Sequence, residues 1–153
     1  MKIHKASAHH VRQAALSLSQ SDREEMDRVQ PGRDPYQVLE ACLDDPSLMA
    51  ISDEHGNVLA VGGSPLKCIW FVHTVHAEKL KGKGRRKMFY MLSKHLSSIK
   101  DEAVSACSDD LYHFTNIVSE QNVKHVRLLK ALGAVFLPAP VTLNGHKFKQ
   151  FLF

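Results

Sequence analysis

The chain has 153 residues, 44% of them hydrophobic and 24% charged, which is typical of a globular protein and excludes a disordered or collagen-like chain. No apolar run reaches the roughly 20 residues that span a bilayer. Three widely spaced cysteines without a C-x-x-C pair argue against a disulfide framework or a zinc module. The net charge of +4 favours acidic partners without requiring one. We therefore expect a single domain over residues 1–153 and no membrane partner.

Hydrophobic periodicity and turn residues predict a series of strands and helices. In chain order we expect a strand at 2–6, a helix at 8–18, a short helix capped by Ser21 or Asp22 and ended by Pro31-Gly32, a helix at 36–43 opened by Asp34-Pro35, strands at 47–51, 58–61 and 68–74, a helix at 85–99, a strand at 112–118, a helix at 123–132, and strands at 134–137 and 147–153. The order βαα(α)βββαβαββ predicts an α/β or α+β fold with helices on both faces of the sheet.

The segment between the strand at 68–74 and the helix at 85–99 is rich in glycine and basic residues. Six of the nine residues from Lys79 to Lys87 are basic and none is acidic. Gly82 and Gly84 let backbone N–H groups approach a ligand, and the helix that follows points its positive end at the same place, an arrangement that favours phosphate. The alternative is a solvated helix start in which the glycines serve only a tight turn. A Rossmann loop and a P-loop are excluded because their spacings are absent.

Three segments together resemble the GNAT superfamily of N-acetyltransferases. Residues 79–84 (KLKGKG) are similar to its motif A, Gln/Arg-x-x-Gly-x-Gly/Ala. Residues 50–63 resemble the β2–β3 hairpin, and residues 122–134 resemble motif B. The resemblance implies a mixed, mostly antiparallel central sheet of about six to seven strands. Stretches at 68–72, 80–87 and 125–136 also resemble the internal virion or head morphogenesis proteins of T7-like tailed phages.

The GNAT resemblance implies that acetyl-CoA or CoA is the cofactor. Its phosphates would lie on motif A, and its acyl-pantetheine arm would pair with the preceding strand. The residues expected to bind it are Phe71, Val72, His73, Thr74, Lys79, Leu80, Lys81, Gly82, Lys83, Gly84, Arg85 and Asn122.

Departures from the superfamily pattern leave catalysis open. Leu129 stands where active members often carry a tyrosine general acid, and the strand at 68–74 lacks the glutamate that commonly activates the amine. Acetyl transfer needs a base and often an acid. The candidates are His73 and His113 as bases and Tyr112 as an acid, each with ordinary packing as the alternative. Early helices line the acceptor groove in the superfamily, so the resemblance places Glu24 and Glu25 there, with a surface role as the alternative.

Two functions remain after this comparison. The first is an acetyl-CoA-binding phage protein of the virion interior or of assembly, with weak or lost catalysis, whose partners are other phage head or internal virion proteins. The second is an active transferase that moves an acetyl group to a primary amine. Nucleic acid is a less favoured partner of the basic segment. No metal site is expected, because His73 and His76 would face opposite sides of a strand. The expected location is the host cytoplasm during infection, or the virion.

Overall fold

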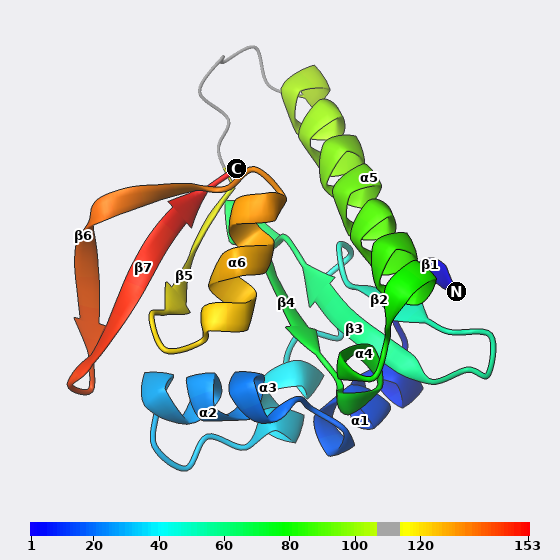
Figure 1. Cartoon of the computed structure of the whole chain (residues 1–153), viewed down its shortest axis with the longest axis horizontal. Helices are drawn as coiled ribbons and strands as arrows, with labels where there is room; N and C mark the ends of the chain where they lie inside the picture. Colours follow the sequence, from blue (N-terminus) through cyan, green and yellow to red (C-terminus); the bar gives the residue numbers. More distant parts are fainter. Residues whose placement is uncertain (107–113) are drawn as a thin grey trace.

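The computed structural model describes residues 1–106 and 114–153. Tyr112 and His113 lie outside this part, as does the start of the strand predicted at 112–118. The elements in chain order are β1 (Lys2–Lys5), α1 (Ala8–Leu16), α2 (Gln20–Val29), α3 (Pro35–Glu40), β2 (Met49–Ser52), β3 (Val58–Gly63), the 3₁₀ turn η1 (Pro65–Lys67), β4 (Trp70–His73), α4 (Val75–Glu78), α5 (Gly82–Ala106), β5 (Thr115–Ser119), α6 (Val123–Ala131), β6 (Val135–Leu143) and β7 (His146–Leu152). The predicted order is confirmed, with the short α4 and η1 as additions (Figure 1).

The strands form two antiparallel sheets. The first has the order β1-β2-β3-β4 and the second the order β5-β7-β6. An isolated parallel bridge between Cys68 and Thr115 joins the two sheets, next to the start of β4 and β5. The predicted mixed, mostly antiparallel architecture is confirmed, but the strands divide into sets of four and three. The near-continuous hydrophobicity of residues 68–74 is typical of a central strand, but β4 lies at the edge of the first sheet.

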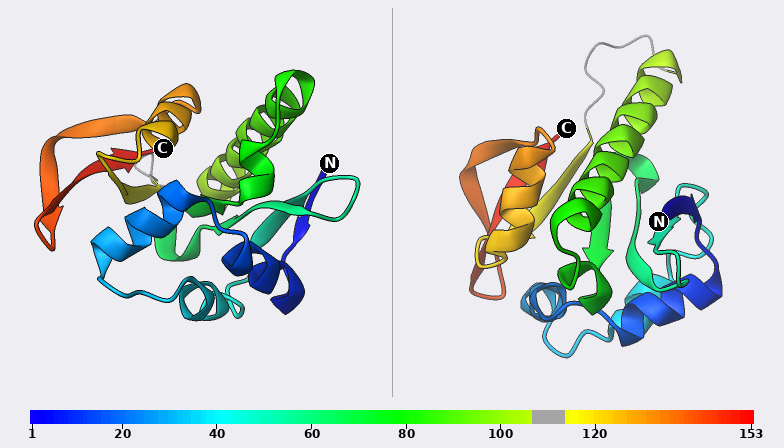
Figure 2. Two further views of the ribbon diagram at one scale, coloured as in Figure 1. Left: turned by 60° about the horizontal axis from the view of Figure 1, so that its bottom comes forward. Right: turned by 45° about the vertical axis from the view of Figure 1, so that its right-hand side comes forward.

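Helices cover both faces of the sheets, as predicted (Figure 2). On one face, α1 and α3 pack on β2 and β3 through a core that includes Val11, Leu39 and Val61. On the other face, α5 and α6 pack on the second sheet around Leu96, Leu129 and Phe151. The amino-terminal part of α5 rests on β2 and β3 through a third core cluster.

The start of α2 differs from the prediction. Ser19 caps α2, and its hydroxyl accepts a hydrogen bond from the backbone N–H of Asp22 at 3.2 Å. The sequence had suggested Ser21 or Asp22 as the cap. Because Ser19 takes this role, the Asp22 carboxylate is available to other partners, and its side chain is 5% exposed. The cap predicted at Asp34-Pro35 is confirmed for α3.

The helix predicted at 85–99 is longer in the structure. It begins at Gly82, whose φ of +48° is a backbone conformation that few residues other than glycine adopt. The Gly-x-Gly motif therefore forms the first turn of α5 rather than a loop before it. No helix within the described residues is long and apolar enough to cross a membrane.

Candidate functional site

The candidate site lies where β4 and β5 diverge. At one end the backbone N–H of Ile69 donates to the carbonyl of Thr115, and the Asn116 amide donates to the carbonyl of Ile69. At His73, four residues after Ile69, the neighbour of β4 is no longer β5 but α2 and its N-cap residue Ser19. There the N–H of His73 donates to the Asp22 carboxylate at 2.6 Å, and the N–H of Ser19 donates to the carbonyl of His73.

Phe71 occupies the opening between these two ends. Its partner across the sheet is Gly62, where a Cβ atom would lie 2.6 Å from the Cβ of Phe71. Only glycine allows this close approach. Gly62 is therefore a positioning residue for the part of β4 that faces the opening.

A buried carboxylate holds two histidines at this opening. One oxygen of Asp22 lies 3.6 Å from Nδ1 of His73, and the other lies 3.6 Å from Nδ1 of His125 on α6. The two imidazole rings are 5.6 Å apart, and the His125 ring also packs on Phe71 at 4.6 Å. Burial by itself would raise the pKa of Asp22, but the favourable interactions with His125 and His73 outweigh it and lower the pKa well below its usual range. Asp22 therefore carries a negative charge at neutral pH.

Asn122 and Glu25 complete the cluster. The side-chain amide of Asn122, the N-cap residue of α6, donates to Asp22 at 3.0 Å and to Glu25 at 2.6 Å. Burial raises the pKa of Glu25, with a smaller contribution from the Asp22 charge, while His125 and Asn122 oppose this shift. Nδ1 of His125 is buried and has no hydrogen-bond partner among the described residues.

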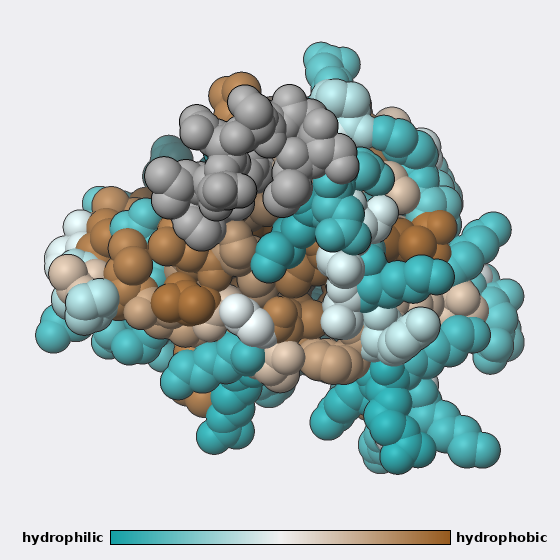
Figure 3. Space-filling view, turned by 90° about the horizontal axis from the view of Figure 1, so that it is seen from above, coloured by the Kyte–Doolittle hydropathy of each residue, from teal (hydrophilic) through white to brown (hydrophobic). Residues whose placement is uncertain are grey.

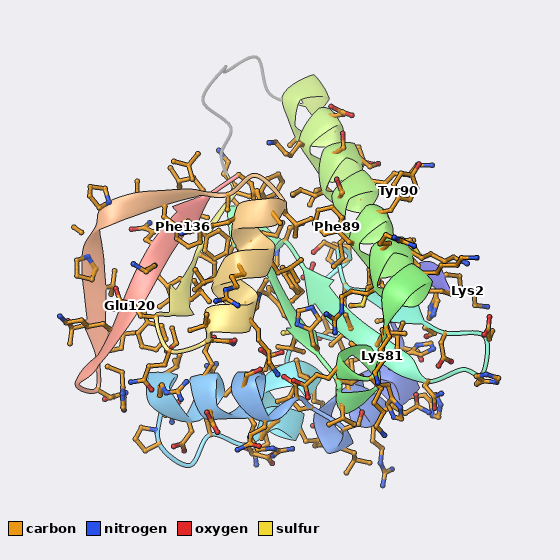
Figure 4. The ribbon with its side chains drawn as sticks, viewed as in Figure 1. Lys2, Lys81, Phe89, Tyr90, Glu120 and Phe136 are labelled. Atoms are coloured by element: carbon orange, nitrogen blue, oxygen red, sulfur yellow. The ribbon has the colours of Figure 1, made fainter. Side chains whose placement is uncertain are left out.

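Two cavities meet at this cluster. A cleft of about 800 Å³ runs between α6 and the amino-terminal end of α5, and His73, Arg85 and Arg86 are among its lining residues. Figure 4 shows Phe89 pointing from α5 toward α6, where it lines this cleft, while Tyr90 points away. A second cavity of about 350 Å³ lies on the α2 side. Asp22 and His125 line both cavities, so the cluster is the place where the contents of the two would meet.

The structure places the residues predicted to bind the cofactor in different environments. His73, Gly82, Arg85 and Asn122 line the cleft. Phe71 and Val72 line the second cavity. Thr74 is fully buried with its hydroxyl donating to the carbonyl of Val58, and Leu80 packs against the third core cluster. The remaining predicted residues do not line the cleft, namely Lys79, Lys81, Lys83 and Gly84.

An ion pair also crosses the cleft mouth. Lys124 on α6 donates to Glu78 on α4 at 2.8 Å, and both residues line the cleft. The pair links α6 to α4.

The sequence analysis missed Asp22 and His125 as site residues. Asp22 was read as a helix-cap candidate, and His125 was noted only as part of motif B. The signal was weak, because the two residues are about one hundred positions apart and only the packing of α2 against α6 joins them. Glu25, which the resemblance places on the acceptor side, lines the second cavity. Glu24, by contrast, is exposed and pairs with Arg28.

One group of described side chains could also hold a cation. Single ligand atoms of Asp22, Glu25 and His125 lie within 4.8 Å of one another. The Asn122 amide already bridges the two carboxylates, so an ion would have to displace it.

A family model described as "Bacteriophage T7, probable scaffold protein Gp13" matches residues 47–139. The chain belongs to this family. The probable scaffold protein gp13 of Escherichia phage T7 is 30% identical over 98 residues, which are 64% of this chain and 65% of the phage T7 protein. The chain thus spans just under two thirds of that relative. Asp22 and Glu25 lie outside the segment that the family model matches.

Solved structures show the GNAT fold. An N-acetyltransferase from Staphylococcus aureus Mu50 matches with a TM-score of 0.60 and 12% identity over 100% of both chains. A GNAT-family acetyltransferase from Bacillus cereus ATCC 10987 matches with a TM-score of 0.58 and 12% identity, covering 99% of this chain and 95% of the other. Naa20 from Chaetomium thermophilum, solved with a bisubstrate analogue, has a TM-score of 0.58 and 12% identity over 99% of this chain and 85% of its own. The predicted GNAT-like phage protein is therefore confirmed at the level of fold and family.

Proposed function

We propose that this protein is an acetyl-CoA-binding member of the Gp13 scaffold family that acts in assembly of the phage head, in the infected host cell or the particle. The observation that carries the binding proposal is the cleft of about 800 Å³ that begins at the first turn of α5 and ends at His73 and His125. Gly82, Arg85 and Arg86 stand at its α5 end, where the amino-terminal end of the helix and two guanidinium groups favour phosphate.

A calorimetric titration with CoA and with acetyl-CoA tests this proposal. Replacing both Arg85 and Arg86 by alanine should weaken binding about tenfold, because each exposed charge contributes up to ~1 kcal/mol. The matched control removes Lys87 and Lys94, two exposed basic residues of the same helix that do not line the cleft. Equal losses in the two double variants, or no binding by the native chain, would contradict a cofactor site in the cleft.

The assembly role is supported by the family match and has its own test. An infection that lacks the native protein would be complemented with the native chain or with the Arg85 and Arg86 double variant. Filled particles with the native chain alone would link assembly to the cleft. If both chains restore filled particles, assembly does not require the cofactor. If neither chain does, the assembly role is wrong.

Acetyl transfer to a primary amine is a second candidate function. The specific observation in its favour is the Asp22 cluster, where two imidazoles stand at the junction of two cavities. An acetyl-CoA in the first cavity and an amine in the second would meet there. Leu129 is buried and cannot serve as a general acid. Another group would have to take that role, which supports weak rather than efficient turnover.

A further inference from the structure

His125 is a buried titratable group for which acetyl-CoA binding alone gives no reason. It lies in the first turn of α6 with 12% of its side chain exposed. Its Nδ1 atom is buried and has no hydrogen-bond partner among the described residues, although the Asp22 carboxylate is 3.6 Å away. Because Asp22 pairs with this imidazole from beyond hydrogen-bond distance, the imidazole can exchange a proton with a third molecule in the cavities.

The surroundings of His125 restrict what that molecule can be. The centre of its ring lies 4.6 Å from the centre of the Phe71 ring, and Phe71 belongs to the part of β4 at the opening. His125 lines both cavities, whereas His73 lines only the cleft between α5 and α6. A group that bridges the cavities and reaches the opening of β4 would therefore touch both imidazoles. Pairs of titratable groups around one charge are a common source of an acid and a base.

We infer that His125 is the catalytic residue that protonates the departing thiolate in acetyl transfer, with Asp22 as its positioning residue and His73 as the base. The inference rests on the second candidate function. A neutral primary amine attacks the acetyl carbonyl carbon, so that the C–N bond forms. As the C–S bond breaks, His73 takes the proton that the nitrogen loses and the imidazolium of His125 gives its proton to sulfur. Exchange with water then returns both histidines to their starting states.

The test uses the whole 153-residue chain with a panel of butylamine, a polyamine and a lysine peptide. His125→Gln should reduce turnover of acetyl-CoA at least ~100-fold, the usual contribution of a general acid. The loss should shrink to about threefold with acetyl thioesters of aryl thiols, whose thiolates leave without a proton. A merely structural role would reduce both reactions equally. Imidazole added to a His125→Ala variant should restore part of the turnover.

Controls separate this inference from the binding proposal. His76→Gln removes a histidine that lines neither cavity and should leave turnover unchanged. Acetyl-CoA affinity and melting temperature are measured for every variant. If the native chain does not bind acetyl-CoA, the proposed function fails. If it binds but acetylates no amine, or if His125→Gln stays folded and loses both reactions equally or neither, the role of His125 is wrong.

Discussion

Asp22 shows how one buried carboxylate can organise a site. It accepts hydrogen bonds from the backbone of His73 and from Asn122, and it lies at 3.6 Å from two imidazoles. A buried charge of this kind is stable only while its partners remain, because an unpaired charge in the interior is costly. The neighbouring Glu25 is in the opposite situation, since burial dominates and its pKa is raised.

Asp22→Asn should lower the free energy of unfolding by about 3 kcal/mol at pH 7, the usual effect of breaking a buried pair. The folded-state pKa of Asp22 lies below its unfolded value of ~3.9, so its contribution is complete above that value and is lost as pH falls further. Urea unfolding from pH 7 to pH 3 should show the variant and native curves converging below pH ~4. A constant difference across this range would contradict the charge-based explanation.

Glu25→Gln is the matched variant with the opposite expectation. The raised pKa means that the ionised form of Glu25 reduces stability at neutral pH, and this cost disappears as pH falls through the folded-state pKa. A glutamine oxygen can still accept from Asn122. The same urea series should therefore show no loss of stability at pH 7, and a marked loss would be inconsistent with this account.

Leu129 gives a second prediction at the scale of one residue. It is fully buried and packs with Val126 and Leu132 in the second core cluster. Leu129→Tyr inserts a larger polar ring and should lower stability by about 1–3 kcal/mol. Turnover should not rise, because Leu129 lines neither the cleft nor the second cavity. Melting temperature and acetyl-CoA consumption are the measurements, and increased turnover would show that the cleft reaches this position.

At the scale of elements, β4 is only partly available for pairing with a ligand. Thr74 donates its N–H to Leu59 on β3, and the alternation of an antiparallel pair then directs the N–H groups of Phe71 and His73 away from β3. His73 already donates to Asp22. The expected strand-like pairing of a pantetheine arm is therefore limited to the neighbourhood of Phe71.

Hydrogen exchange can test this limit. In the ligand-free protein the amide of Phe71 should exchange faster than those of His73 and Thr74, which are hydrogen-bonded. Acetyl-CoA should slow exchange at Phe71 and leave the other two nearly unchanged. Equal protection of all three amides before ligand is added would mean that the opening is already closed.

At the scale of the whole molecule, Asn122 joins parts of the chain that belong to different sheets and layers. It caps α6, and its amide donates to Asp22 and Glu25 on α2, about one hundred residues earlier. Figure 1 shows α2 crossing below the gap between the two sheets, where α6 begins. The connection holds the amino-terminal helices against the segment that the family model matches.

Asn122→Ala should lower the free energy of unfolding by about 3 kcal/mol, since it removes a helix cap worth ~1 kcal/mol and leaves two buried carboxylates short of a donor. Gln121→Ala, at the exposed neighbouring position, should change it by less than about 0.5 kcal/mol. Chemical denaturation of both variants is the measurement. Similar small effects would show that other contacts hold α2 in place.

The surface of the molecule has a more apolar part and a more polar part. Seen from above, hydrophobic side chains gather on the side formed by β6 and β7, and polar side chains surround the part formed by α5 (Figure 3). Val135 is 64% exposed at the start of β6, and Tyr90 is 65% exposed on α5.

Local patterns in the sequence determined most of the elements. The cap at Asp34-Pro35, the turn at Pro31-Gly32 and the period of the helices predicted the order of the elements, and the resemblance of three segments to the GNAT superfamily predicted the fold. These features could be predicted because each depends on residues within a few positions of one another. The same reasoning placed His73 and Gly82 in the candidate site.

The tertiary structure alone decided which side chains meet. Asp22 and His125 carry no local signal that joins them, because their contact depends on how α2 crosses the gap between β4 and β5. The division of the strands into sets of four and three had the same origin, since strand divergence follows from the packing of helices against both sheets. The histidines that folding brings beside Asp22 keep it charged, and burial raises the pKa of Glu25; both effects are properties of the folded chain.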